Sequence, residues 1–290
     1  MKKLGDRRDA KRVKGLDGVH QLIPYIKPKR CDSDVYMNKK TDVTELVKYM
    51  EKLKKKYPDK KITYFHLFSM AIAKVFYNKP LLNRFVINKN YYDHNDVKLA
   101  FVAKVAFDKE SKEMLTTIKV NKDTDLFKLA DIISKKVSNI RSNKNSDTDK
   151  AVEIVGKLPK FLRTIIMAVF KFMDNHDLLP SSLTENDIYH SSIILSNLGS
   201  IDCGSIYHNL TDFGTSSILL TMGKIHKEPI VNEKGEIEIK DLCDFGINLD
   251  ERIADGLYFA KSINLFEYIL QNPKLLEGRA DEPINFDSKK

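Results

Sequence analysis

The 290-residue sequence predicts an α+β domain, because helical and strand-like patterns follow one another without a fixed strand–helix alternation. Apolar residues make up 42% of the chain and charged residues 31%, a composition that can bury a core and is not typical of a disordered chain. The sequence contains neither a GxGxxG nor a GxxxxGK[ST] loop, which argues against the nucleotide-binding folds built on those loops. Together these observations favour an α+β fold over a doubly wound parallel sheet.

Two helices are predicted in the first quarter of the chain. They follow a charged segment, residues 1–35, that shows no clear periodicity and is expected to form a basic N-terminal arm or an irregular lead-in. Thr41 or Asp42 can cap a helix that continues to about Tyr57 with one apolar stripe. The more apolar stretch at about 63–77 predicts a second helix that is buried on most sides.

Strands and two further helices account for most of the remaining chain. The strands are expected at about 84–87, 97–107, 114–120, 192–196, 216–225 and 237–249. The last of them is the clearest, because its apolar side chains fall on odd positions and so share one face. Helices are expected at about 126–141 and 254–270.

Two additional helical stretches are expected between these elements, at about 149–155 and 158–173. The second is apolar, but it is too short and too charged to span a bilayer, since it contains Lys160, Arg163 and Lys171. Its polar side chains lie mainly near one face, which favours packing on the core or at a subunit interface. A helix that lies on a membrane surface is the alternative.

The positive charge of the chain is concentrated near its N-terminus. Lysine and arginine exceed aspartate and glutamate by 49 to 40, a net charge of +9. Residues 1–61 hold 19 basic and 9 acidic side chains, whereas residues 62–290 hold 30 and 31. A body that is close to neutral argues against a fold that binds a polyanion over its whole surface, so nucleic acid is not expected as a partner.

The cysteines are too few and too scattered for a disulfide framework or a zinc site, and no metal is expected. They are Cys31, Cys203 and Cys243. The first 20 residues lack the apolar stretch of a signal peptide. We therefore expect a cytoplasmic protein with reduced thiols and no membrane span.

Polar residues gather where the clearest strand leads into the last helix. This junction reads Leu249-Asp250-Glu251-Arg252-Ile253-Ala254-Asp255-Gly256. Strand–helix junctions often present functional groups. The alternative is a purely structural cluster, in which Asp255 caps the helix, Arg252 pairs with an acid and Gly256 eases the turn.

The junction resembles the Asp-His-Arg-x-x-Asp-Gly signature of the dihydrolipoamide acyltransferase catalytic domains of 2-oxoacid dehydrogenase complexes. Chloramphenicol acetyltransferases share that fold and a related motif. Five other segments resemble this family in the same order, at 42–46, 65–75, 80–83, 194–199 and 272–276. The resemblance implies an acyltransferase-like domain at 36–277, between the 1–35 segment and a C-terminal tail at 278–290, with a helical insertion at about 145–187.

The resemblance also implies a fold, an assembly and an activity. The fold is a chloramphenicol acetyltransferase-like mixed sheet flanked by helices, assembled as a homotrimer with active sites between subunits. Coenzyme A is the implied co-substrate, and a small molecule the acyl acceptor. Ser196 matches the serine that stabilises the oxyanion, Arg252 the motif arginine, and Asp255 the acid that holds the site through polar contacts with an arginine. Asn197 and Gly256 are motif residues expected to support the site.

The sequence departs from the family at the catalytic histidine, which is Glu251 here. Taking a proton from a thiol of pKa about 8.5 costs roughly 3 kcal/mol for an imidazole and roughly 6 kcal/mol for an ordinary glutamate. Three hypotheses follow. Glu251 acts as a retuned base, His208 in the loop after the Ser196 strand supplies the base, or the site is silent and the fold serves binding or assembly. An exposed loop histidine is the structural alternative for His208.

The sequence shows no lipoyl domain and no Pro/Ala-rich linker before the acyltransferase-like region. We therefore expect a free-standing trimer rather than a swinging-arm component of a large complex. The leading hypothesis is a CoA-dependent acyltransferase homologue. The alternative is a catalytically silent acyltransferase-fold protein for binding or scaffolding.

Overall fold

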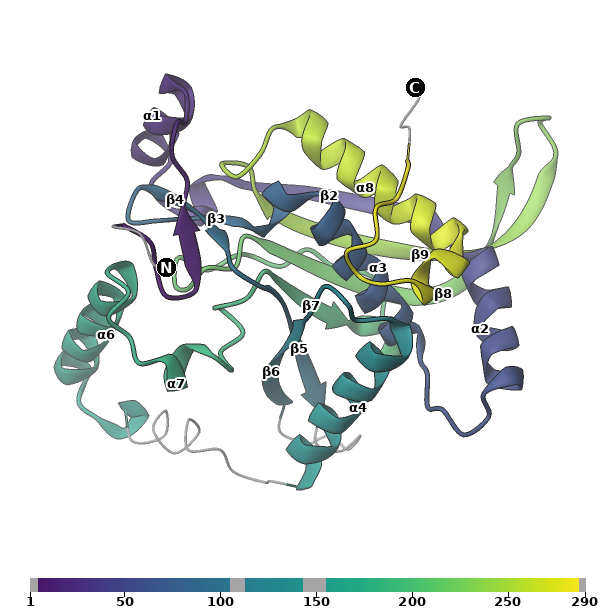
Figure 1. Ribbon diagram of the computed structural model, residues 1–290, viewed down its shortest axis with the longest axis horizontal. Helices are drawn as coiled ribbons and strands as arrows, with labels where there is room; N and C mark the ends of the chain where they lie inside the picture. The colour runs from purple at the N-terminus through teal and green to yellow at the C-terminus, as the bar shows by residue number, and fades with distance from the viewer. Residues whose placement is uncertain (1–4, 105–112, 143–154, 287–290) are drawn as a thin grey trace.

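The computed structural model describes residues 5–104, 113–142 and 155–286, and within them the largest sheet has six strands (Figure 1). Its strand order is β2-β9-β8-β7-β5-β6. The strands are β2 (Asp34–Asp42), β5 (Val97–Lys104), β6 (Glu113–Val120), β7 (Ile193–Asn197), β8 (Ile218–Val231) and β9 (Ile237–Asp250). β7 runs parallel to both β5 and β8, and the other pairs are antiparallel. This mixed sheet confirms the predicted fold class.

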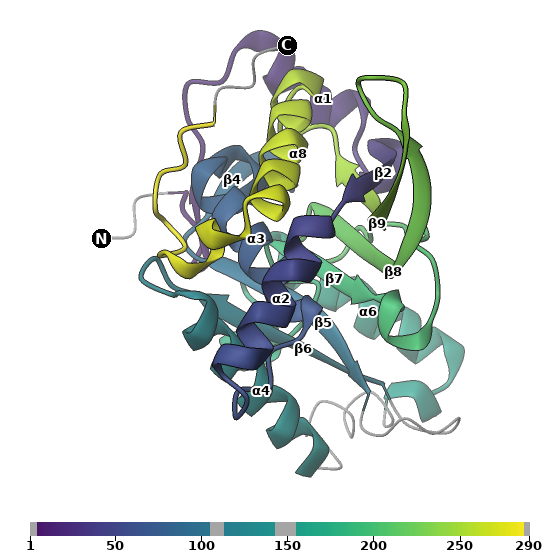
Figure 2. The same cartoon turned by 90° about the vertical axis from the view of Figure 1, so that its right-hand side faces the viewer.

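Four helices pack against one face of this sheet (Figure 2). They are α2 (Thr44–Lys56), α3 (Tyr64–Asn78), α4 (Leu126–Ser142) and α8 (Gly256–Gln271). As predicted, α3 is buried over most of its length, and Phe68 from it packs edge-to-face on Phe245 of β9. On β9, the odd-numbered residues Cys243, Phe245 and Leu249 belong to the same core, as the alternation predicts.

Residues 5–35 contain more regular secondary structure than the sequence predicts. β1 (Ala10–Arg12) joins a second sheet, in the order β1-β4-β3, with β3 (Arg84–Ile87) and β4 (Asn90–His94). α1 (Gly18–Ile26) follows, capped by Asp17, whose carboxylate accepts a hydrogen bond from the backbone of His20. The expectation of an irregular lead-in is therefore wrong for this part of the segment.

The insertion predicted at about 145–187 is described from residue 155 onward. It contains α6 (Lys160–Asn175) and the short α7 (Ser181–Thr184). Within α6 only Asp174 is buried, so the helix does not pack on the core of the chain. Packing at a subunit interface, the other part of that expectation, stays a prediction. The helix predicted at about 149–155 lies outside the described residues except for its last residue. None of the helices in the described ranges is both long and apolar enough to cross a membrane.

Short 3-10 helices complete the chain at its turns. They are η1 (Arg30–Asp32), η2 (Pro80–Asn83), η3 (Leu198–Ile201) and η4 (Pro273–Glu277). η3 follows β7 directly and opens the loop that leads to β8. Segments around residues 188–189 and 210 pack on the sheet face opposite the helices, through Ala100, Ile194 and Leu219.

Candidate functional site

The strand–helix junction after β9 is built around a buried ion pair between Asp250 and Arg252. The guanidinium donates from Nε to Asp250 Oδ1 at 2.8 Å and from Nη2 to Oδ2 at 2.7 Å. Asp250 is 0% exposed and Arg252 2%. A third donor, Arg252 Nη1, reaches the carbonyl oxygen of Lys27 at 2.9 Å. This pair holds the junction and fastens the segment after α1 to it.

Asp255 and Gly256 begin α8. Asp255 is the N-cap residue and accepts a hydrogen bond from the backbone of Tyr258 at 2.7 Å. The resemblance implies a polar contact between Asp255 and an arginine. The motif arginine, Arg252, pairs with Asp250 instead. A Cβ at position 256 would meet open space, so no close approach requires Gly256. Asp255 and Arg252 therefore have the capping and ion-pairing roles that a purely structural cluster at this junction requires.

Glu251 lies at the surface beside Lys27. The ammonium of Lys27 forms an ion pair with Glu251 Oε1, and the two residues are each about 40% exposed. Lys27 is thus held twice, through its side chain by Glu251 and through its carbonyl by Arg252. Because the ammonium stabilises the charged carboxylate, Glu251 loses that stabilisation when it accepts a proton from a thiol. Sequence patterns did not point to Lys27, which lies 224 residues from its partner.

Ser196 and Asn197 end β7, where both are partly exposed. Through the strand register Ser196 pairs with Thr221 of β8, and Thr221 pairs with Gly246 of β9. Glu251 follows Gly246 by five residues, which corresponds to about 17 Å along β9. Ser196 lies two strands away from β9, with a spacing of about 4.8 Å between neighbouring strands. Ser196 and Glu251 of one chain therefore do not meet.

His208 lies in an exposed loop that crosses the sheet. Its backbone donates to Asn248 Oδ1 at 3.1 Å, and its ring Nδ1 is 3.4 Å from the carbonyl oxygen of Asn209. Thr221 fixes the same loop, since its hydroxyl donates to Ile206 O at 2.5 Å and accepts from Ile206 N at 3.2 Å. These contacts place the loop firmly, and the His208 ring remains exposed above it.

Gly246 explains how the loop can approach so closely. A Cβ at this position would overlap the carbonyl oxygen of Ile206. A Cβ at Gly223 would lie 2.8 Å from the backbone nitrogen of Ser205, which is also too close. The loop is therefore fitted to two glycines of the sheet, one on β8 and one on β9, and His208 comes to lie near Asn248, three residues before Glu251.

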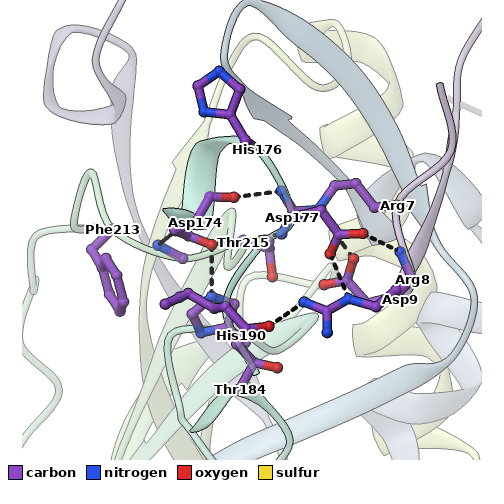
Figure 3. Close-up of polar contacts among 12 residues, drawn as sticks. Arg7, Arg8, Asp9, Asp174, His176, Asp177, Thr184, His190, Phe213 and Thr215 are labelled. Carbon is purple, nitrogen blue, oxygen red and sulfur yellow. Dashed lines mark hydrogen bonds and ion pairs between the residues drawn. The ribbon is translucent and has the colours of Figure 1, made fainter. Parts of the chain in front are cut away.

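A second polar cluster, which the sequence did not indicate, joins the insertion to the sheet (Figure 3). His190 lies at its centre and is 2% exposed at its side chain. Its Nδ1 is 2.6 Å from Asp187 Oδ2 and its Nε2 is 3.0 Å from Asp174 Oδ1. Because a carboxylate only accepts hydrogen bonds, both ring nitrogens carry protons here. The other oxygen of Asp174 accepts from the backbone of Gly214 at 3.0 Å, and Arg7 Nη1 donates to the Asp174 carbonyl.

This cluster predicts a loss of stability in mild alkali. Burial alone would lower the pKa of His190, but the hydrogen bonds to Asp174 and Asp187 outweigh it and raise the pKa to about 8. A raised pKa stabilises the folded chain fully below about pH 6.5, and the contribution is lost as the pH rises through 8. We expect the free energy of unfolding to fall by about 2 kcal/mol between pH 6.5 and 9, measured by chemical denaturation.

The matched control for this prediction is His190→Gln, which is expected to show a much flatter profile over the same interval. Burial lowers the pKa of His66 and of His94 to about 4. Their contribution to the pH dependence of stability therefore lies mainly at pH values below 6.5, outside this interval. A wild-type profile that is as flat as that of His190→Gln contradicts a protonated His190.

No group of three or more His, Cys, Asp or Glu side chains within the described residues is arranged to hold a metal ion. The three cysteines are free thiols, with Cys31 and Cys203 exposed and Cys243 buried. Burial raises the pKa of the Cys243 thiol to about 12. Cys243 is therefore a core residue and not a nucleophile.

Comparison with known families supports the resemblance noted in the sequence. The family model described as "2-oxoacid dehydrogenases acyltransferase (catalytic domain)" matches residues 30–151 and 176–277. The match spans both Ser196 and the junction at 250–256, and it leaves out residues 152–175, which include all of α6. The mitochondrial lipoamide acyltransferase component of the branched-chain alpha-keto acid dehydrogenase complex of Bos taurus is 31% identical over 94 residues. That alignment covers 32% of this chain and 19% of the bovine protein.

Solved structures resemble the chain over nearly its full length. A probable dihydrolipoamide acetyltransferase from Listeria monocytogenes has a TM-score of 0.59 at 18% identity, covering 93% of this chain and 96% of its own. The dihydrolipoamide acetyltransferase of Azotobacter vinelandii has a TM-score of 0.60 at 14% identity, with 91% and 93% covered. A chloramphenicol acetyltransferase reaches 0.53 at 9% identity, with 91% and 98% covered. At these identities the likeness concerns the fold, and it confirms the predicted architecture.

Proposed function

Because the chain belongs to the family of 2-oxoacid dehydrogenase acyltransferase catalytic domains, we propose that it transfers acyl groups between coenzyme A and a small acceptor. The observation that carries this proposal is the family match, which includes both the Ser196 segment and the junction at 250–256. Ser196 lies at the end of β7 with its side chain partly exposed, as a residue that meets substrate must be. The cytoplasm, with its reduced thiols, is the compartment we propose for this activity.

In the proposed reaction the acceptor attacks the thioester carbonyl of acyl-CoA. A bond forms between the acceptor atom and the acyl carbon, the carbon–sulfur bond breaks, and the thiol of coenzyme A leaves. The Ser196 hydroxyl donates a hydrogen bond to the oxyanion of the tetrahedral intermediate. The acceptor loses a proton during attack, so the site also needs a base.

We propose Glu251 as that base, with His208 as the second candidate. The carboxylate lies where the family has its histidine, and its ion pair with Lys27 opens as it takes the proton. Lys27 is then left beside a neutral acid and is free to contact an anionic group of the substrate. His208 is exposed, and its loop crosses β9 at Asn248, close to Glu251.

The proposed site is completed by a second subunit. In one chain, Ser196 and Glu251 are separated by about 20 Å according to the strand register. A homotrimer, in which Ser196 of one chain faces Glu251 of the next, brings the two groups together. One of the solved structures that resemble the chain is the cubic core of a pyruvate dehydrogenase multienzyme complex. Sedimentation of the purified chain tests the trimer directly.

Replacing Ser196 by alanine is expected to lower the rate of acyl transfer about 100-fold, because one donor to the oxyanion is lost. The effect is expected on kcat, while the affinity for coenzyme A, measured by calorimetry, stays unchanged. Ser200→Ala is a matched control, since Ser200 lies in the same segment and donates to the Asn197 carbonyl at 2.7 Å. Equal rates for Ser196→Ala and Ser200→Ala contradict the role of Ser196.

A catalytically silent protein for binding or scaffolding is the second candidate function. The ion pair between Glu251 and Lys27 favours it, because it occupies the carboxylate that has to accept the proton. Turnover of acetyl-CoA across a panel of amine, alcohol and thiol acceptors distinguishes the two functions. Turnover supports the enzyme, and binding of coenzyme A without turnover supports the silent protein. Neither turnover nor binding of coenzyme A contradicts the proposed acyltransferase.

A further inference from the structure

The helix α6 carries a row of exposed apolar side chains that the proposed reaction does not use. We refer to these side chains as the α6 surface. It consists of Phe161, Leu162, Ile165, Val169 and Phe172. Phe161 is 65% exposed and Phe172 57%, which is unusual for aromatic side chains of this size. Within the described part of the chain, no other helix exposes two phenylalanines.

The bulkiest members of the α6 surface point in one direction. At 100° per residue, Phe161, Ile165 and Phe172 fall within about 40° of one another around the helix axis. At the C-terminal end of the helix the opposite flank contacts the protein, where Asp174 is buried and hydrogen-bonds to His190 and Gly214. The cluster around His190 therefore fixes the C-terminal end of α6, and the apolar side chains of the α6 surface remain exposed. The helix lies on the left of the molecule in Figure 1.

All the charges along this part of the chain are positive. Residues 157–173 contain four basic side chains and no acidic one, in a chain that is 31% charged. Lys160 and Lys171 lie within about 20° of each other on the helix and are both exposed. Asp174, the acidic residue of α6, is buried, so the exposed charges of the helix are basic. A helix with one apolar side and exposed basic charges is typical of segments that lie in the interface of an anionic membrane.

A basic hollow adjoins the C-terminal half of α6. It has a volume of about 180 Å³, and its lining includes Lys171 of α6 together with the exposed Lys29 and Lys89. Asp212 is the one acidic side chain in that lining. Basic side chains grouped beside an apolar helix offer contacts for the phosphates of lipid headgroups.

We propose that the α6 surface binds an anionic phospholipid bilayer, with α6 lying in the plane of the interface and the basic hollow taking up headgroup phosphates. Spanning the bilayer is excluded for α6, because it has 16 residues and four charged side chains, including the buried Asp174. A second copy of the chain is the less suitable partner, since two α6 surfaces brought together face each other with positive charges alone. All of α6 lies within the segment that the family match leaves out, so the proposal concerns a property of this chain beyond acyl transfer.

Flotation with lipid vesicles tests this proposal. The full chain is expected to float with vesicles of equimolar phosphatidylcholine and phosphatidylglycerol, and to stay in solution with vesicles of pure phosphatidylcholine. The double variant Phe161→Ser/Phe172→Ser is expected to lose roughly tenfold or more of its partitioning for each phenylalanine. Lys160→Glu/Lys171→Glu is expected to weaken binding most strongly at low salt.

Matched controls come from exposed residues of the same types elsewhere. Ile237→Ser on the β8–β9 hairpin replaces a side chain that is 74% exposed, and Lys52→Glu/Lys55→Glu reverses two exposed lysines of α2. Both controls are expected to bind vesicles like the wild type. Circular dichroism checks that every variant is folded.

Three outcomes overturn the proposal. The first is no flotation of the wild type with anionic vesicles, and the second is equal loss of binding in the α6 variants and the controls. The third is a lipid-free association, measured by sedimentation, that Phe161→Ser/Phe172→Ser abolishes while vesicle binding is unaffected. That result assigns the α6 surface to contact between copies of this chain.

Discussion

Replacing Glu251 by histidine is expected to raise the rate of acyl transfer to a thiol acceptor about 100-fold. An imidazole of pKa about 6.5 is a stronger base than a carboxylate of about 4.3, and the difference corresponds to about a hundredfold more thiolate. The ion pair with Lys27 disappears at the same time. Initial rates with acetyl-CoA and dihydrolipoamide measure the effect.

Glu251→Gln is the matched control, because it removes the base and the ion pair but supplies no imidazole. If Glu251 is the natural base, Glu251→Gln is slower than the wild type and Glu251→His is faster. If the natural protein is silent, only Glu251→His turns over. If His208 supplies the base, Glu251→Gln keeps the wild-type rate and His208→Ala loses it. A Glu251→His variant without increased turnover contradicts the expectation that this position limits the reaction.

The sequence predicted the elements whose side chains alternate or repeat clearly. β9 was recognisable because Cys243, Phe245 and Leu249 face one core, and α3 because most of its turns are apolar. β2 was missed, since it is an edge strand whose residues are mostly partly or fully exposed and so carry little alternation. α1 was missed for a similar reason, because only Pro24 of its residues is buried.

The candidate site was predictable only in part. The motif segments containing Ser196 and Glu251 were found from their order along the chain. Lys27 was not, because an ion pair across 224 residues leaves no local pattern. The cluster around His190 depends in the same way on tertiary contacts, since Arg7 and Asp174 come together only after folding. Asp255 shows the reverse case, in which the capping role read from the local sequence is the one the structure displays.

Replacing Arg252 by alanine is expected to destabilise the fold by about 3–5 kcal/mol. The substitution leaves the Asp250 carboxylate buried at 0% exposure, with the backbone nitrogen of Arg252 as its remaining donor at 3.1 Å. It also removes the hydrogen bond to the Lys27 carbonyl, which releases the segment after α1. Urea denaturation at constant pH measures the loss as a shift of the midpoint at an unchanged slope.

The chain contains its own control for this effect in Arg279, which pairs with Asp281 through Nε and Nη2 at the same two-residue spacing. Arg279 is 63% exposed, so Arg279→Ala is expected to cost less than about 1 kcal/mol. The double variant Asp250→Asn/Arg252→Met is expected to recover much of the stability that Arg252→Ala loses, because no charge is then left unpaired. Equal losses of stability for Arg252→Ala and Arg279→Ala contradict a burial-dependent ion pair at the junction. If the double variant recovers no stability, the hydrogen bond to the Lys27 carbonyl matters more than the unpaired Asp250 carboxylate.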